Sequence, residues 1–128
     1  MSDRGTISPL IAAYLSLVLS VAIGAASVGI AIVAGHRVQG VADFALLHAH
    51  DRSVTAGKVD QAELERHLAD FLSSAPSAAR LEVLTAEVET DGELSRLRLC
   101  ARYRSVLGLG FDSFISCRQS KAKSYLVP

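Results

Sequence analysis

The chain has 128 residues, half of them hydrophobic, and its 13 basic and 13 acidic residues leave no net charge. This length excludes a large multidomain protein, because it leaves room for one long helix and a small domain of about ninety residues. The zero net charge hides a segregation: residues 38–93 carry four basic and eleven acidic side chains, whereas residues 94–128 carry seven basic and one acidic. The two patches can pair within the domain or between copies, but two solvated faces are favoured, because exposed ion pairs contribute little energy.

An apolar stretch dominates the first part of the chain. Residues 7–34 contain no charged side chain, and at about 1.5 Å per helical residue they exceed the roughly 30 Å core of a bilayer. We therefore predict a membrane span over residues 7–34, preceded by a polar leader, residues 1–5. The apolar run continues well past the small residues near Ala25, where a signal peptidase could cut, so retention of the helix is favoured over its removal.

Small residues cluster in the second half of this stretch. Ala25 and Gly29, and again Ala31 and Gly35, have the spacing that lets membrane helices approach closely. We interpret these four residues, together with Gly24, as candidate helix-packing positions.

The helix is expected to continue beyond the membrane. After Gly35, apolar residues recur every three or four positions as far as Ala49, and no proline interrupts them. The spacing predicts one helix over residues 6–54, wholly apolar in its first part and amphipathic in its second. Such a helix suits a subunit that packs against other helices, since a plain anchor does not need the second part.

Residues 58–128 are expected to form a small extracytoplasmic domain. Asp60 and Glu63 have the spacing of a capping box, with Glu63 reaching back, and predict a second helix that runs to about Ser74 and is closed by Pro76. One apolar stripe on this helix consists of Leu64, Leu68, Phe71 and Leu72.

Strand patterns follow the second helix. Residues 80–89 and 94–104 form two predicted strands, joined by a tight turn at Asp91-Gly92, and residues 113–126 return as a third. The middle strand alternates, with Leu97, Leu99, Ala101 and Tyr103 on one face and Arg96, Arg98, Cys100, Arg102 and Arg104 on the other. The predicted fold class is therefore α+β, a long N-terminal helix followed by a short helix and a small antiparallel three-stranded sheet.

Two cysteines lie in the last two predicted strands. Antiparallel pairing of these strands would let Cys100 meet Cys117. A disulfide is the natural interpretation if the domain lies outside the cytoplasm, and two reduced core cysteines are expected if it lies inside. The charges that flank the span, Arg4 on one side and His36 and Arg37 on the other, give little orientation signal. The cysteine pair therefore favours N-terminus in and C-terminus out.

No pattern in the sequence indicates an enzyme. His48, His50 and Asp51 are residue types that can bind a metal ion. Residues two apart on a helix point to nearly opposite sides, so we expect His48 and His50 to be surface side chains. Gly108 and Gly110 lack the third glycine of a dinucleotide-binding loop. We therefore predict no catalytic residue, no metal site and no cofactor.

The arginines of the middle strand form a candidate basic patch, which consists of Arg96, Arg98, Arg102 and Arg104. Such a patch, with Lys121 and Lys123, could contact phosphates. Only Tyr103 is interleaved with these arginines, and it falls on the opposite face of the strand, whereas single-stranded nucleic acid is bound where aromatic and basic side chains share a surface. A solvated strand surface is therefore favoured over a nucleic-acid site.

The N-terminal organisation resembles a known family. A short leader ending in Asp-Arg-Gly5 runs directly into the apolar helix, which is followed by HRVQGVADFALLHAH at residues 36–50. Over roughly residues 3–50 the chain is similar to the TadE-like minor pilins of tight-adherence (Tad, type IVb) pilus systems, in the short form of high-GC Gram-positive bacteria. The resemblance implies cleavage by a prepilin peptidase between Gly5 and Thr6, and export of the C-terminal part across the cytoplasmic membrane. It also implies assembly with other pilin-like subunits and a secretion machinery, in a structural role.

One position departs from that family. Pilins carry glutamate as the fifth residue after cleavage, where it can pair with the terminal amine of a neighbouring subunit, and here that residue is Leu10. A buried carboxylate without its partner is costly, so leucine fits a minor subunit, for instance at a tip, that has no such neighbour. The alternative is an unprocessed single-pass membrane protein whose exported domain binds a ligand or partner and has no connection with pili.

Overall fold

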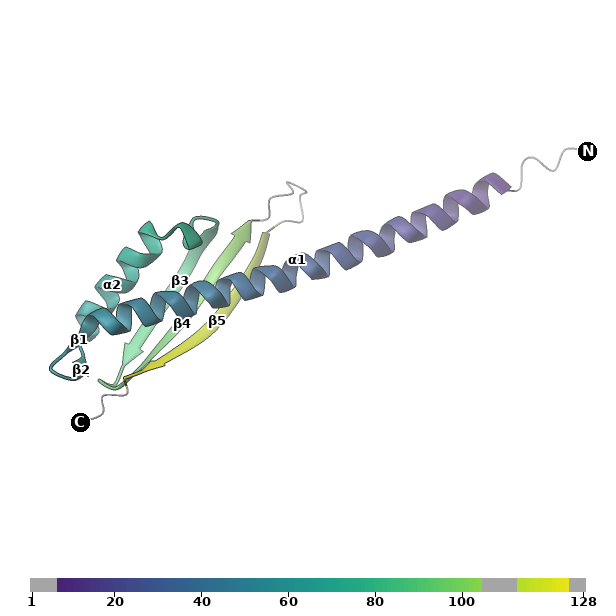
Figure 1. Ribbon diagram of the computed structural model, residues 1–128. Helices are drawn as coiled ribbons and strands as arrows, with labels where there is room; N and C mark the ends of the chain where they lie inside the picture. The colour runs from purple at the N-terminus through teal and green to yellow at the C-terminus, as the bar shows by residue number, and fades with distance from the viewer. Residues whose placement is uncertain (1–6, 105–112, 125–128) are drawn as a thin grey trace, which may run out of the picture.

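Two α-helices and a three-stranded antiparallel sheet make up most of the computed structural model, which describes residues 7–104 and 113–124 (Figure 1). In chain order the elements are α1 (Ile7–Ser53), β1 (Val54–Thr55), β2 (Lys58–Val59), α2 (Gln61–Ser74), the 3-10 turn η2 (Pro76–Ala78), β3 (Leu81–Thr90), β4 (Leu94–Arg104) and β5 (Ser113–Lys123). The α+β class and the order of its main elements are confirmed. The proposed processing site at Gly5 and Thr6, and the glycines Gly108 and Gly110, lie outside the described residues.

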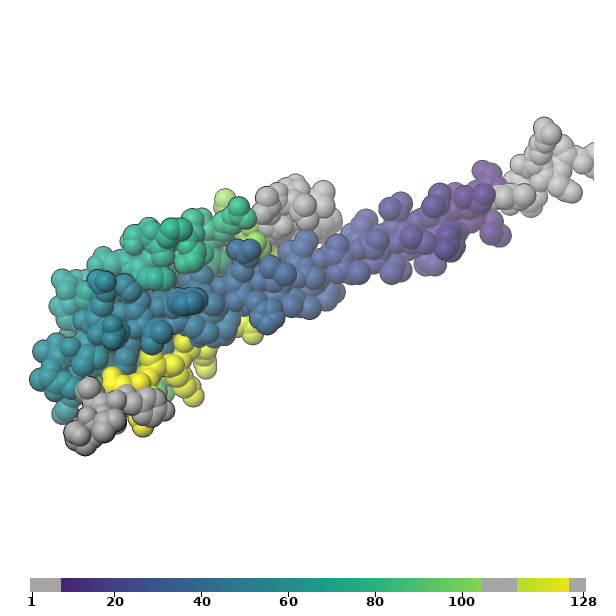
Figure 2. Space-filling view, viewed as in Figure 1, coloured from purple at the N-terminus to yellow at the C-terminus, as the bar shows by residue number. Residues whose placement is uncertain are grey.

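α1 is one continuous helix in two environments. Its N-terminal half projects away from the rest of the protein, and its C-terminal half lies across the sheet (Figures 1 and 2). The helix can run unbroken because its one proline, Pro9, lies in the first turn, where no intrahelical hydrogen bond is lost. The fully buried side chains of its second half are Ala34, Val38, Ala42, Ala45, Leu46 and Ala49.

The sheet has the strand order β3-β4-β5, and both neighbouring pairs are antiparallel. The alternation predicted for the middle strand is confirmed, since Leu97, Leu99, Ala101 and Tyr103 are buried. α1 and α2 pack on this inner face, where Leu46 of α1, Leu64 of α2 and Leu99 of β4 belong to one buried cluster. The predicted turn between β3 and β4 is present, with Gly92 in the left-handed region at φ 97°.

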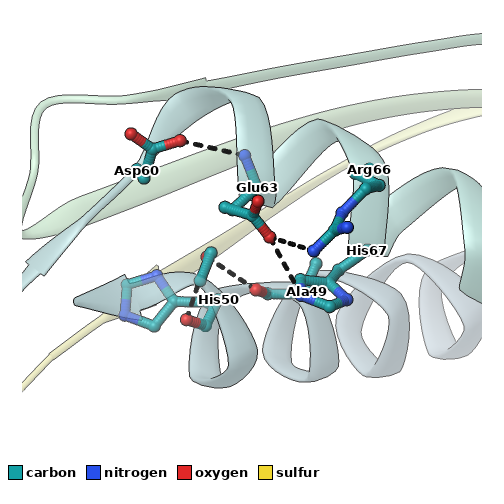
Figure 3. A network of polar contacts seen from close by, with 7 residues as sticks. Ala49, His50, Asp60, Glu63, Arg66 and His67 are labelled. Atoms are coloured by element: carbon teal, nitrogen blue, oxygen red, sulfur yellow. Dashed lines mark hydrogen bonds and ion pairs between the residues drawn. The ribbon is translucent and has the colours of Figure 1, made fainter.

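The start of α2 differs from the predicted capping box in one respect (Figure 3). Asp60 caps the helix as expected, and its Oδ1 accepts a hydrogen bond of 3.0 Å from the backbone N–H of Glu63. The Glu63 side chain does not reach back, because the backbone N–H of Asp60 already donates to the carbonyl of Ser53 at 3.0 Å. It turns forward along the helix instead, to the guanidinium of Arg66 and to Nε2 of His67 at 3.5 Å.

A small hairpin that the sequence did not predict joins the two helices. α1 ends at Ser53, one residue before its expected end, and β1 and β2 then pair antiparallel. Both residues of the connecting turn have positive φ, 50° at Ala56 and 81° at Gly57. This conformation matches the two-residue turns that suit the twist of a hairpin, although alanine is an unusual residue for it.

Glutamine side chains from the helices close parts of both sheet edges. On β3, Gln61 of α2 donates from Nε2 to the carbonyl of Val88 at 2.8 Å and accepts at Oε1 from the N–H of Thr90 at 3.0 Å. On β5, Gln39 of α1 donates to the carbonyl of Gln119 at 3.2 Å. These amides stand in for the backbone partners that a further strand would supply, and so leave less open edge for another chain to pair with.

Candidate functional surface

The N-terminal half of α1 is an extensive exposed apolar surface. Leu10 is 73% exposed and Val21 65%, and other large apolar side chains along this half are exposed to a similar degree. By length and composition, α1 is the one helix within the described part of the chain that could cross a membrane. Apolar surface of this extent requires cover from lipid or from other protein.

The packed half of α1 has two opposite faces. Val38 is fully buried against the sheet. Gly29 and Leu47 are each about two and a half turns away from it, and so lie on the opposite side of the helix. We call this side the outward stripe, which consists of Ala25, Gly29, Val33, Gly40, Phe44 and Leu47, with His36 on the same line.

The outward stripe carries apolar surface from the membrane segment onto the folded domain. Phe44 is 67% exposed and Leu47 is 59% exposed, although both belong to the half of α1 that packs on the sheet. Sequence reasoning did not single out these two residues, because the buried face opposite them already accounts for the three-to-four spacing. The sequence does contain a signal for them: Phe44 and Leu47 are large apolar residues that fall outside the apolar face formed by Val38, Ala42, Ala45 and Ala49.

The five predicted helix-packing residues do not share one environment. Gly24, Ala25 and Gly29 are exposed, and a Cβ added to Gly24 or Gly29 would meet no heavy atom within 4 Å. Ala31 is half-buried, and Gly35 is buried beneath the side chain of Arg118. The pair Ala25 and Gly29 is therefore available to another helix, whereas the small size of Gly35 serves a contact within its own chain.

The predicted basic patch is interleaved with carboxylates. The register of β3 and β4 places Arg96 opposite Glu89, Arg98 opposite Glu87 and Arg102 opposite Glu82. Oε2 of Glu82 lies 3.3 Å from Nη1 of Arg102 and 3.6 Å from Nη2 of Arg104. The acidic and basic blocks of the sequence thus meet across the outer face of one sheet. Alternating charge of this kind favours a solvated surface, because the carboxylates repel a phosphate backbone.

A disulfide joins β4 and β5 on the same outer face. Cys100 and Cys117 are directly opposite in the strand register, and their Sγ atoms are 2.07 Å apart. The pairing expected from the strand order is therefore present. A disulfide of this kind persists in an oxidising compartment.

His50 is buried, and the expectation that it is a surface residue is wrong. Its Nδ1 lies 2.8 Å from Oγ of Ser95, its Nε2 lies 2.7 Å from Oγ of Ser124, and only 5% of the residue is exposed. The ring thus ties the end of α1 to the start of β4 and to the residue after β5. Burial lowers the pKa of His50 below its ordinary value of 6.5, and the Asp51 carboxylate opposes this only in part.

His48 takes no part in the contacts of His50. Its ring packs against Phe71 of α2, with the ring centroids 5.3 Å apart. Across residues 7–104 and 113–124, no three histidine, cysteine, aspartate or glutamate side chains are grouped so that they could hold a metal ion. These histidines therefore support packing between elements.

Comparisons with protein families, with curated proteins and with solved structures found no match to this chain. The fold and its surface define a structural class, a small α+β domain with an internal disulfide, carried on a long helix whose apolar half is exposed.

Proposed function

We propose that this protein is a structural subunit, anchored in a membrane by α1 and assembled with other pilin-like subunits through the same helix. The proposal also draws on the resemblance of residues 3–50 to the TadE-like minor pilins. In this role the leader is cleaved between Gly5 and Thr6, the domain is exported with the N-terminus on the cytoplasmic side, and the protein catalyses no reaction.

The observation that carries the proposal is that the outward stripe has large exposed apolar side chains in the domain half of α1 as well as in the membrane half. A simple anchor needs apolar surface only within the bilayer. Leu47 lies thirteen residues beyond Ala34, a distance of about 20 Å along the helix axis, and it is still exposed. Helices of neighbouring subunits would cover both the membrane half and the domain half of the stripe, with Ala25 and Gly29 allowing close approach.

Leu10 supports a minor subunit over a repeating one. It is 73% exposed and apolar at the position where pilins carry the glutamate that pairs with the next subunit. A subunit without that carboxylate lacks the charge pair that would specify repeated addition of identical copies, and it brings no unpaired charge into the membrane. We therefore propose a place at the tip of a filament, or at its start, for this protein.

Photo-crosslinking in the native host tests the assembly contact. A photoreactive residue at Leu47 is expected to give adducts with another pilin-like subunit. The matched control is Ile115, which is 60% exposed against 59% for Leu47 but lies on the outer face of the sheet. Adducts at Leu47 and none at Ile115 support the proposal. Adducts at Ile115 alone would overturn it in favour of a membrane-anchored domain that binds its partner through the sheet.

A further inference from the structure

A cavity of about 330 Å³ lies beside the packed half of α1. Residues of four elements line it, and among them are Arg37, Gly40 and Phe44 of α1, Ser77 of η2, Arg80 just before β3, Leu81 of β3 and Tyr103 near the end of β4. The lining therefore combines apolar and aromatic side chains with two arginines.

Two arginines and one tyrosine supply charged and polar groups to this cavity. Arg37 and Arg80 are exposed, and neither forms an ion pair with any carboxylate of the described residues. The Arg37 Cζ lies 6.0 Å from the centroid of the Tyr103 ring. Tyr103 is only 5% exposed, yet within the described part of the chain its hydroxyl has no hydrogen-bond partner. Buried tyrosine hydroxyls are normally hydrogen-bonded, and Tyr103 is one of the residues that line this cavity.

The position of Arg37 along α1 indicates the kind of ligand that the cavity would take. Arg37 lies three residues beyond Ala34, about 4.5 Å along the helix axis from the end of the apolar stretch. The polar layer of a bilayer adds about 5–7 Å on each side of the hydrocarbon core. With α1 in a membrane, Arg37 falls within that layer, where arginine side chains meet lipid phosphates.

We propose that the cavity binds the headgroup of an anionic phospholipid. The phosphate accepts hydrogen bonds from the guanidinium groups of Arg37 and Arg80 and from the hydroxyl of Tyr103. The glycerol and the acyl chains extend from the phosphate toward the apolar half of α1, because Phe44 lies seven residues beyond Arg37, on the side away from the bilayer. The inference rests on the membrane anchor of the proposed function, and it concerns the subunit before assembly, because Gly40 and Phe44 also belong to the outward stripe.

The test uses the full chain in neutral detergent micelles. Bound lipid is counted by native mass spectrometry during titration with phosphatidylglycerol or phosphatidylcholine, and glycerol 3-phosphate is added in a separate arm. The variant R37Q/R80Q removes both cations from the cavity, and R96Q/R98Q removes the same charge from the outer face of the sheet. A third variant, Gly40→Phe, places a ring at the cavity; a Cβ at Gly40 meets no heavy atom within 4 Å, and circular dichroism checks the fold of the variant.

We expect phosphatidylglycerol to bind in preference to phosphatidylcholine. Each arginine removed from the cavity should weaken binding by roughly a factor of five, so about 25-fold for R37Q/R80Q. Gly40→Phe should also abolish the preference, whereas R96Q/R98Q should change binding by less than about twofold. Any of three results would overturn the inference: no preference for the anionic lipid, an equal loss in R96Q/R98Q, or equally tight binding of glycerol 3-phosphate.

Failure of this inference is distinguishable from failure of the proposed function. A chain that requires detergent for extraction from membranes but shows no lipid preference retains its anchor and loses only the lipid site. A chain released from membranes without detergent contradicts the anchor itself.

Discussion

Gly35 of α1 lies directly beneath the guanidinium group of Arg118 from β5. A Cβ built on Gly35 would be 2.5 Å from Nη2 of Arg118, closer than side chains normally approach. Ala34 and Gly35 are also the first buried residues along α1. The contact therefore marks the point where the domain begins to pack on the helix, and it separates the exposed half of α1 from the packed half.

Substitution of Gly35 by alanine is expected to preserve the fold, because only the tip of a flexible side chain has to move. Alanine favours a helix over glycine by about 1 kcal/mol. In wild type, part of this gain is offset by displacement of Arg118, whereas in an Arg118→Ala background the whole gain should appear. Thermal unfolding of the four proteins of this cycle, followed by circular dichroism in detergent, measures the difference. A destabilisation of more than about 1 kcal/mol by Gly35→Ala in the Arg118→Ala background would contradict the contact.

Stability is expected to fall as the pH is lowered through the range in which His50 titrates. Burial holds the pKa of His50 in the folded protein below 6.5, its ordinary value. The unfolded chain therefore binds this proton at a higher pH than the folded chain does. The stabilisation is complete above about pH 6.5 and is lost progressively as the pH falls from there through the folded pKa.

Melting temperatures measured from about pH 8 to pH 5 test this dependence. His50→Gln should flatten the curve across that window, and it should also cost about 1–3 kcal/mol at neutral pH, because the fully buried Ser95 loses its partner. The control is His36→Gln at an exposed position of α1. A curve that rises as the pH falls, or that flattens equally in the control, would argue against the role of His50.

Removal of the Cys100–Cys117 disulfide is expected to destabilise the domain by about 3 kcal/mol, since a loop of this size, with a sequence separation of 17, is then free to open in the unfolded chain. Unfolding of C100S/C117S should match that of the reduced wild type. Reductant should leave the variant unchanged. Equal melting temperatures for the reduced and the oxidised wild-type protein would contradict the presence of the disulfide.

Gln61→Leu is expected to destabilise the protein by about 2 kcal/mol, because it leaves the carbonyl of Val88 and the N–H of Thr90 without their partner. It should also promote aggregation by opening the edge of β3. Gln119→Leu on the exposed face of β5 is the control and should have little effect on stability. Chemical unfolding and light scattering report the two outcomes, and equal behaviour of the two variants would contradict the edge contact.

The sequence predicts those parts of the fold that repeat along the chain. The continuity of α1 follows from an apolar pattern that Pro9 does not interrupt, and the two faces of β4 follow from strict alternation. Both patterns are local, so they need no knowledge of distant residues. The Cys100–Cys117 pairing follows once the strand order is known.

The remaining features depend on contacts between distant parts of the chain. His50 can be buried because its two ring nitrogens form hydrogen bonds with Ser95 and Ser124, which lie 45 and 74 residues away. The β1–β2 hairpin is too short to show a strand pattern, and Ala56 gives no turn signal despite its positive φ of 50°. The outward stripe was hidden for another reason: an exposed apolar face is recognised only when the buried face of the same helix is known.

The mature N-terminus is the most direct test of the central claim, that α1 is the assembly helix of a processed pilin-like subunit. Mass spectrometry of the protein purified from the membranes of its host measures it in one experiment. The account predicts a chain that begins at Thr6. A chain that retains Met1 or begins at Ser2, or one that begins near Ala25, would contradict it.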